Sequence, residues 1–215
     1  IIKDQNVVFD ADISADFGED LAFQKVEMSV DSRNGELVLP DLYEEPLIYE
    51  TLNLRGFYDN TGDTLQIETA SVKIRDILFK LSADLTAEPA HISGPIRLEI
   101  PETSIARVRA VMPDQELDED IDEWLFQKIK KGEISGLKAE GQLDIEQDSP
   151  QDEVQNKDQN TKALNARLLE PKVGFDFNDL ELEYAFGLMP VSQGRGTFSL
   201  DGEKISVAAE RGQLG

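Results

Sequence analysis

The sequence predicts a mainly β fold, a long antiparallel sheet of repeated hairpins with one or two short amphipathic helices. The first observation is a period-two alternation of apolar and polar residues, which recurs along most of the 215-residue chain and is typical of strands. The second is that helical spacing is confined to residues 103–131. Strands that are apolar on one face only indicate an antiparallel sheet with one covered face and one face in water.

The first group of strands is predicted before Pro101. In its first run the apolar residues share one face, and Asp10, Asp12 and Asp16 lie on the other. The apolar members of the runs are, in chain order, Phe9, Ala11, Ile13, Ala15 and Phe17; Val26, Met28 and Val30; Leu37 and Leu39; Leu52 and Leu54; Leu65 and Ile67; Val72 and Ile74; Ile77, Phe79, Leu81, Ala83 and Leu85; and Ile96, Leu98 and Ile100.

Two helices are predicted next. Residues 103–112 have apolar residues at helical spacing, and Pro113 ends that helix. Residues 118–131 begin with acidic residues and end with lysines, which matches the helix dipole, and Gly132 is predicted as the residue after the helix. We expect this second helix to pack on the sheet through Ile121, Trp124, Leu125 and Ile129.

Alternation resumes at Leu137 and continues to the end of the chain, with a break at 146–163. That stretch is polar and acidic, and we expect a disordered insertion because it cannot bury enough apolar surface to order itself. A final hairpin is predicted around Asp201-Gly202. Residues 55–69 align without gaps on 195–209, which indicates either a reused hairpin unit or the glycine and alternation that any two hairpins share.

The composition bounds the function. A formal charge of −23 disfavours binding to nucleic acid or to anionic membrane surfaces, and the chain has no cysteine and a single histidine, His91. No phosphate loop, zinc motif or nucleophile-base pair is present. The acidic run "DQELDEDIDE" lacks the mid-loop glycine of a calcium-binding EF-hand, "DADISADFGED" is explained by the polar face of the first strand, and "DNTGD" is a turn. We therefore expect a protein that is not an enzyme and has no metal or cofactor.

Periodicity alone leaves three arrangements for the apolar face: a closed sandwich or barrel, a sheet covered by helices, and an open trough lined for apolar ligands. Two short helices are too few to cover so many strands. Periodicity alone favours the closed sandwich or barrel, and it does not exclude the trough.

Part of the chain resembles a known family. The segments "IRLEIPETSIARVRAVMPD", "WLFQKIKKGEISGLKAEGQL" and "FDFNDLELEYAFGLMPVSQGRGTFSLDGEKISVAAERGQLG" resemble, in their order, the AsmA-like proteins of the bacterial envelope, in their large YhdP-type branch. The resemblance covers roughly residues 95–215 and rests on glycines, prolines and apolar residues. The matching positions are Trp124, Leu125, Gly132, Gly141, Leu182, Tyr184, Pro190, Gly194, Gly196, Gly202 and Gly212.

The resemblance implies a fold and a role. The fold is one domain, 1–215, with a long curved sheet that forms a groove or taco-like trough. The role is phospholipid transport between inner and outer membranes and outer-membrane integrity. The location is the periplasm, as a piece of a larger protein tethered to the inner membrane by an N-terminal segment absent from this chain. The partners are phospholipid or another acyl-chain lipid and the rest of that protein.

The residues expected to contact lipid are Phe9, Ile13, Phe17, Phe79, Leu81, Leu85, Leu143, Leu182, Tyr184 and Phe186. Each also has a plain interpretation as core packing. The alternative function is a closed β-sandwich scaffold or a protein-interaction module of the cell envelope.

Overall fold

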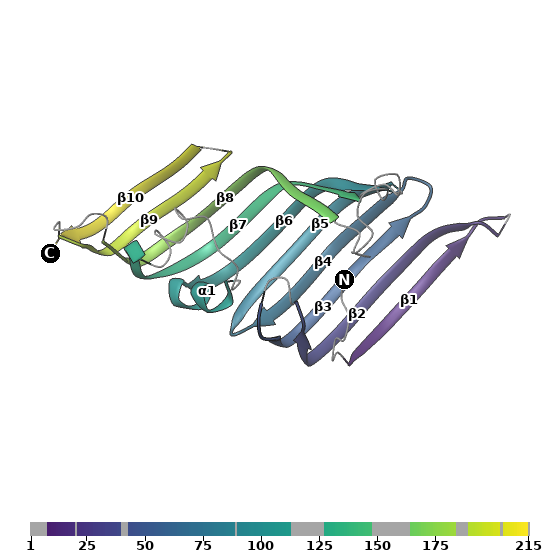
Figure 1. Cartoon of the computed structure of the whole chain (residues 1–215), viewed down its shortest axis with the longest axis horizontal. Coiled ribbons are helices and arrows are strands. Elements are labelled where there is room, and N and C mark those ends of the chain that lie inside the picture. The colour runs from purple at the N-terminus through teal and green to yellow at the C-terminus, as the bar shows by residue number, and fades with distance from the viewer. Residues whose placement is uncertain are drawn as a thin grey trace, which may run out of the picture.

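In the computed structural model, the described residues are 8–19, 21–39, 43–88, 90–112, 127–147, 164–183, 189–202 and 204–214. They form one antiparallel sheet in which each strand pairs with its neighbours in chain order, from β1 at one edge to β10 at the other (Figure 1). The strands are β1 (Phe9–Phe17), β2 (Phe23–Leu37), β3 (Leu47–Asp59), β4 (Thr64–Ile74), β5 (Ile77–Glu88), β6 (His91–Ser104), β7 (Ile129–Gln147), β8 (Leu164–Leu182), β9 (Val191–Asp201) and β10 (Lys204–Leu214). The mainly β prediction is confirmed.

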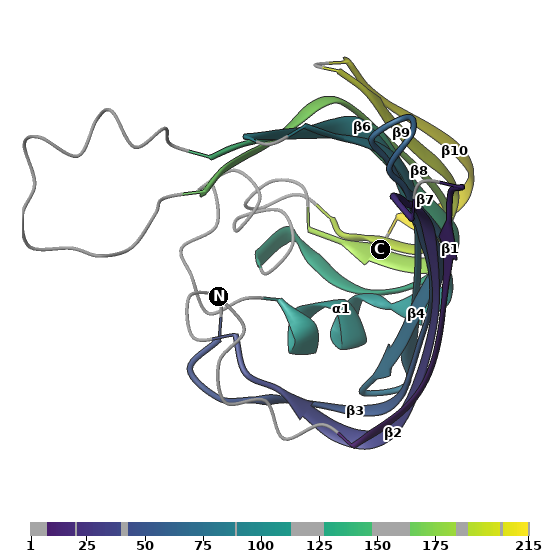
Figure 2. The ribbon, with the colours of Figure 1, turned by 90° about the vertical axis from the view of Figure 1, so that its right-hand side faces the viewer.

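The sheet is open. Because β1 and β10 lie at opposite ends of the strand order, the closed sandwich or barrel that periodicity favoured is wrong for the described strands. Seen along the sheet, the strands bend into an arc that holds the helix α1 (Ile105–Val111) on its inner side (Figure 2). Ten strands at ~4.8 Å spacing make a trough about 43 Å long between its edge strands.

Irregular residues inside the strands account for part of this bend. Asn34, Glu170, Asp179 and Gln193 have positive φ within β2, β8 and β9, and the pairing of β8 shifts register at several points. Such bulges bend a strand and increase its twist. The trough is therefore built into the strands themselves.

The helix α1 lies inside the arc at one rim of the trough, where β6 ends and β7 begins (Figure 1). Ser104 caps its first turn by accepting from the main-chain N–H of Arg107, and Ile105 is buried. At its other end the hydroxyl of Tyr43 donates to the Val111 oxygen at 2.8 Å, and the Arg75 guanidinium donates to the Ala110 oxygen. These donors bind carbonyl groups that a helix end leaves unpaired, so they fix α1 against the sheet.

The predicted C-terminal turn of the second helix is wrong. Ile129 to Lys131 lie in β7, where Ile129 pairs with Leu182 and Lys131 with Glu181, so neither belongs to a helix. Gly132 does not end a helix but is buried within β7, next to Ile105 and Leu180. Pairing with the long β8 overrides the local helical preference of these residues. Ile121, Trp124 and Leu125, and most of the predicted insertion at 146–163, lie outside the described residues.

The predicted hairpin at Asp201-Gly202 is confirmed, with Asp201 opposite Lys204 and Gly202 at φ 60. The two aligned hairpins keep the same residues on the same face but differ in register. Tyr58 pairs with Leu65 in the first, whereas Phe198 pairs with Val207 in the second.

Candidate functional site: the apolar inner face

A continuous apolar row crosses the whole sheet. Reading the strand register from partner to partner gives one residue from each strand, every one of them Ala, Val, Leu or Ile. The row is Ala11, Val30, Leu54, Ala70, Leu81, Leu98, Ala139, Val173, Leu200 and Ile205. None of these ten residues is fully buried. The row is therefore an accessible apolar stripe that runs the length of the trough.

The row lies on the inner side of the arc. Leu52, Val72 and Phe79 share its face, each two residues from a row member on the same strand. They pack with Val111 of α1 in one cluster. Because α1 is inside the arc (Figure 2), this face is the concave one.

The opposite face is polar along the same path. The corresponding row there is Asp10, Asp31, Asn53, Ser71, Lys80, Glu99, Lys138, Gly174, Ser199 and Ser206. Cross-strand ion pairs lie on this face, such as Arg97–Glu140 at 2.7 Å and Lys172–Asp201 at 3.4 Å, with half-exposed side chains. The two faces therefore have opposite solvent preferences across all ten strands.

The rim of the trough on the α1 side contains a small core. Tyr49 is fully buried there, with Leu47 and Ile74, and α1 covers the cluster. The Tyr49 hydroxyl lies 2.6 Å from that of Ser32, which donates to the Val8 oxygen at 2.6 Å. This rim is thus structural, and the accessible apolar surface is the remainder of the inner face.

The edges of the trough are the most exposed part of it. On β1, Phe9, Ile13 and Phe17 are 57%, 71% and 61% exposed, and on β10 Ile205 and Val207 are 65% and 61% exposed. Isolated apolar residues are common on surfaces, but a contiguous apolar stripe of this length indicates a binding surface.

The predicted lipid-contacting residues lie at different positions on the sheet. Leu81 lies in the central row, and Phe9, Ile13 and Phe17 lie on the exposed edge strand. Phe79 packs against the small core at the α1-side rim, so core packing explains it. Leu85 is buried opposite Leu65. Leu143 lies opposite Gly94 and Leu168, and Leu182 is the last residue of β8. Tyr184 and Phe186 lie outside the described residues.

Nine of the ten row members were missed as site residues, since only Leu81 had been predicted. Except for Ala70, alternation had already placed them on the apolar face of their strands. Their assembly into one row depends on register between strands, which no pattern within a single strand reveals.

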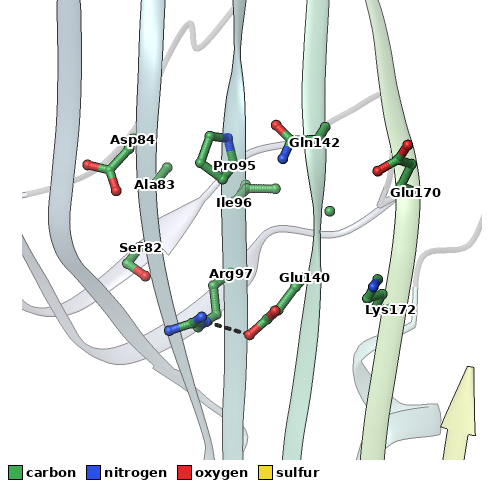
Figure 3. A pocket seen from close by; sticks show the side chains of 11 residues that line it. Ser82, Ala83, Asp84, Pro95, Ile96, Arg97, Glu140, Gln142, Glu170 and Lys172 are labelled. Carbon is green, nitrogen blue, oxygen red and sulfur yellow. Dashed lines mark hydrogen bonds and ion pairs between the residues drawn. The ribbon is translucent and has the colours of Figure 1, made fainter. Parts of the chain in front are cut away.

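Depressions in the surface lie on the polar face. One of about 230 Å³ is lined by Ser82, Asp84, Arg97, Glu140 and Gln142, with their neighbours across β5 to β8. Figure 3 shows the ion pair between Arg97 and Glu140 within it. Another, of about 370 Å³, is lined by Asp176, Asn178, Arg195, Thr197 and Glu210 with their neighbours. Neither is a pocket for an apolar ligand.

Shifted pKa values are found at strand ends and on the polar face. Hydrogen bonds from Thr61 lower the pKa of Asp59, and a hydrogen bond to Glu50 raises the pKa of Lys73. Desolvation is the largest cause that raises the pKa of Tyr58, at the rim of the inner face. Among the described residues, no three His, Cys, Asp or Glu side chains are placed to hold a metal ion.

No protein-family model, curated protein or solved structure matches the chain. In the parts of the chain that the structure describes, no helix has both the length and the apolar character needed to cross a membrane.

Proposed function

We propose that the trough binds the acyl chains of phospholipid or a similar lipid and lets them move along it, without catalysis. The observation that carries the proposal is the accessible apolar row, one residue from each of ten strands. Each methylene removed from water by such a surface contributes about 0.8 kcal/mol, so an acyl chain needs no specific polar partner there.

The length of the trough supports movement of lipid as well as binding. At about 43 Å it exceeds the ~30 Å hydrocarbon core of a bilayer, so it has room for more than one lipid in file. The row has no charged or polar member that would impede an acyl chain. The headgroups would remain in the solvent at the open side of the trough.

The resemblance to AsmA-like envelope proteins gives this activity a setting. We infer that the chain is part of a periplasmic protein tethered to the inner membrane, in which the trough carries phospholipid toward the outer membrane. The charge of −23 keeps the polar outer face soluble and disfavours adsorption to anionic lipid surfaces.

The test is lipid mass spectrometry on protein purified without detergent, comparing three forms of the chain. Leu81→Asp places a carboxylate in the middle of the row. Ser82→Asp is its matched control, because Ser82 is the next residue on the same strand and faces Arg97 on the polar side. Circular dichroism and urea unfolding confirm that each form is folded.

We expect phospholipid to accompany the native chain and Ser82→Asp, and to be lost from Leu81→Asp. Equal lipid in all three forms would show that the row does not bind it. A folded native chain that takes up no lipid even from phospholipid vesicles would leave the scaffold or protein-interaction function in its place.

A further inference from the structure

The two rims of the trough present different surfaces to a ligand. At the α1-side rim, the helix and the small core of Leu47, Tyr49 and Ile74 occupy the inner face. The opposite rim, here called the far rim, carries the turn 60–63 between β3 and β4 and the turn between β5 and β6. The strands β1 and β2 separate the turn 60–63 from the nearer edge of the sheet. The surroundings of this turn therefore belong to the interior of the sheet.

An aromatic pair lies where the inner face meets the far rim. Tyr58 is opposite Val26 on one side and Leu65 on the other, and all three are half-buried. The Tyr58 ring stacks on the ring of Phe23, with the ring centroids 6.2 Å apart. An aromatic side chain with an apolar body and a hydroxyl at its tip suits a boundary between hydrocarbon and water. This pair therefore lies where an acyl chain on the inner face would give way to its headgroup.

The hydroxyl of Tyr58 is directed at the turn. It lies 3.4 Å from Oδ1 of Asp63 and 3.5 Å from Oδ1 of Asn60, which are long distances for bonds between a hydroxyl and an oxygen. Desolvation, followed by the nearby carboxylates, raises the pKa of Tyr58, so its hydroxyl remains a donor. Asp63 is exposed, and this hydroxyl is the only hydrogen-bond partner of its carboxylate among the described residues.

The turn that carries Asp63 is held in place by neighbouring strands. The main-chain N–H of Asn60 donates to the Gln24 oxygen at 2.8 Å, and its side-chain amide donates to the Phe23 oxygen at 3.1 Å. On the other side, the main-chain N–H of Ala87 donates to the Asp63 oxygen at 2.6 Å. The carboxylate therefore has a fixed place beside the aromatic pair, and a ligand bound there need not order the turn.

We propose that Asp63, Tyr58 and Phe23 bind the ammonium group of a phospholipid headgroup, so that the trough prefers lipids with a cationic amine to purely anionic lipids. This inference rests on the proposed lipid-binding function. The Asp63 carboxylate accepts a charge-assisted hydrogen bond from the ammonium group, and the aromatic rings attract the same cation through their faces. The weakly held hydroxyl of Tyr58 donates to the lipid phosphate, and the acyl chains continue past Leu65 on the inner face.

The other charges of the far rim favour the same class of lipid. Three cations of this rim lie on the outer face of the sheet, and each is directly opposite an aspartate: Lys25 with Asp59, Arg167 with Asp144, and Lys204 with Asp201. In the described part of the chain, no cation forms an ion pair with Asp63. A phosphate without an ammonium group would therefore approach an uncompensated carboxylate, whereas a headgroup that has both charges supplies the cation itself.

A competition between two lipids tests the preference. Lipid-free chain is incubated with vesicles that contain phosphatidylethanolamine and phosphatidylglycerol in equal amounts and with identical acyl chains, and the bound lipids are quantified by mass spectrometry. The test variant is Asp63→Asn, because asparagine also tolerates the positive φ of this position. The matched control is Asp31→Asn, which removes the same charge from an exposed residue on the outer face. Tyr58→Leu keeps an apolar side chain and removes the ring and the hydroxyl.

We expect severalfold enrichment of phosphatidylethanolamine on the native chain and on Asp31→Asn. Asp63→Asn and Tyr58→Leu are expected to lose most of this enrichment while they bind the same total amount of lipid. Lipid bound by the native chain without enrichment, or enrichment unchanged in Asp63→Asn, would overturn this inference and leave the trough function standing. An equal loss in Asp31→Asn would overturn it too, because net charge would then explain the preference. A native chain that binds neither lipid would overturn the trough function and this inference together.

Discussion

The linked hydroxyl groups of Ser32 and Tyr49, in the core at the α1-side rim of the trough, allow an asymmetric prediction about stability. The single hydroxyl hydrogen of Ser32 is donated to the Val8 oxygen, so the Tyr49 hydroxyl must be the donor to Ser32. Tyr49 is fully buried and Ser32 is 4% exposed, so neither group has water as a substitute partner. Removing the donor and removing the acceptor are therefore different perturbations.

Tyr49→Phe removes a donor and leaves Ser32 bonded to Val8, which we expect to cost about 0.5–1.5 kcal/mol, the net value of one hydrogen bond. Ser32→Ala leaves the buried Tyr49 hydroxyl without an acceptor, which costs about 1–3 kcal/mol. In the double variant no orphan hydroxyl remains. Its cost is therefore expected to fall short of the sum of the single costs by about 1 kcal/mol.

Urea unfolding of the four forms measures this cycle, since a change of midpoint at constant slope reports a change of stability. The reasoning fails if Tyr49→Phe costs as much as Ser32→Ala. It also fails if the double variant costs the sum of the two single variants, because the two hydroxyls would then be independent.

Three further predictions concern other parts of the sheet. Gly196→Ala is expected to destabilise the β9–β10 pair by about 1–3 kcal/mol because the new methyl group meets a main-chain oxygen of β10. Gly174→Ala is expected to be tolerated, since the nearest atom to its new methyl group is 3.8 Å away. Thermal unfolding and hydrogen exchange in β10 compare the two variants. Tyr43→Phe removes the hydrogen bond to the end of α1 and is expected to cost about 0.5–1.5 kcal/mol, with faster exchange in the helix. Thr61→Val removes a hydroxyl donor and is expected to raise the pKa of Asp59 toward its ordinary value, as measured by carboxyl-carbon NMR. Because the pKa of Asp59 is lowered in the folded chain, the ionised carboxylate stabilises the fold fully above the ordinary carboxyl pKa. This stabilisation is lost as pH falls through the lowered value.

The sequence reveals strand faces well because alternation records which side of each strand is apolar. It also reveals some irregularities. In β4 the apolar positions run Leu65, Ile67, then Ala70 and Val72, and the structure places a bulge where the phase slips. That bulge keeps Ala70 on the inner face, where it joins the central row. A slip in alternation was thus a readable signal for a bulge.

Register between strands and the shape of the sheet were not readable in the same way. Alternation is satisfied equally by any even shift of one strand against its neighbour, so the row from Ala11 to Ile205 is determined by turns and bulges together.

The end of the second predicted helix was wrong for a related reason. Lysines before a glycine suit a helix end, but Ile129 and Lys131 gain backbone partners from a strand more than 45 residues later in the chain.

The small size of the core makes one last prediction about the trough. Only ten hydrophobic side chains of the described residues are buried, and most belong to strand ends on the α1 side. The rest of the inner face gains little from burial in the empty protein, so an apolar occupant adds stabilisation that the chain does not supply for itself. A ligand that binds only the folded state stabilises it by about 2.7 kcal/mol at a hundred times its dissociation constant. We therefore expect lipid-loaded protein to unfold at higher urea concentration than protein stripped of lipid, with Ser82→Asp keeping this difference and Leu81→Asp losing it. Identical unfolding of loaded and stripped native protein would mean that the inner face is satisfied without an occupant, and the apolar row would then have to be explained by contact with protein.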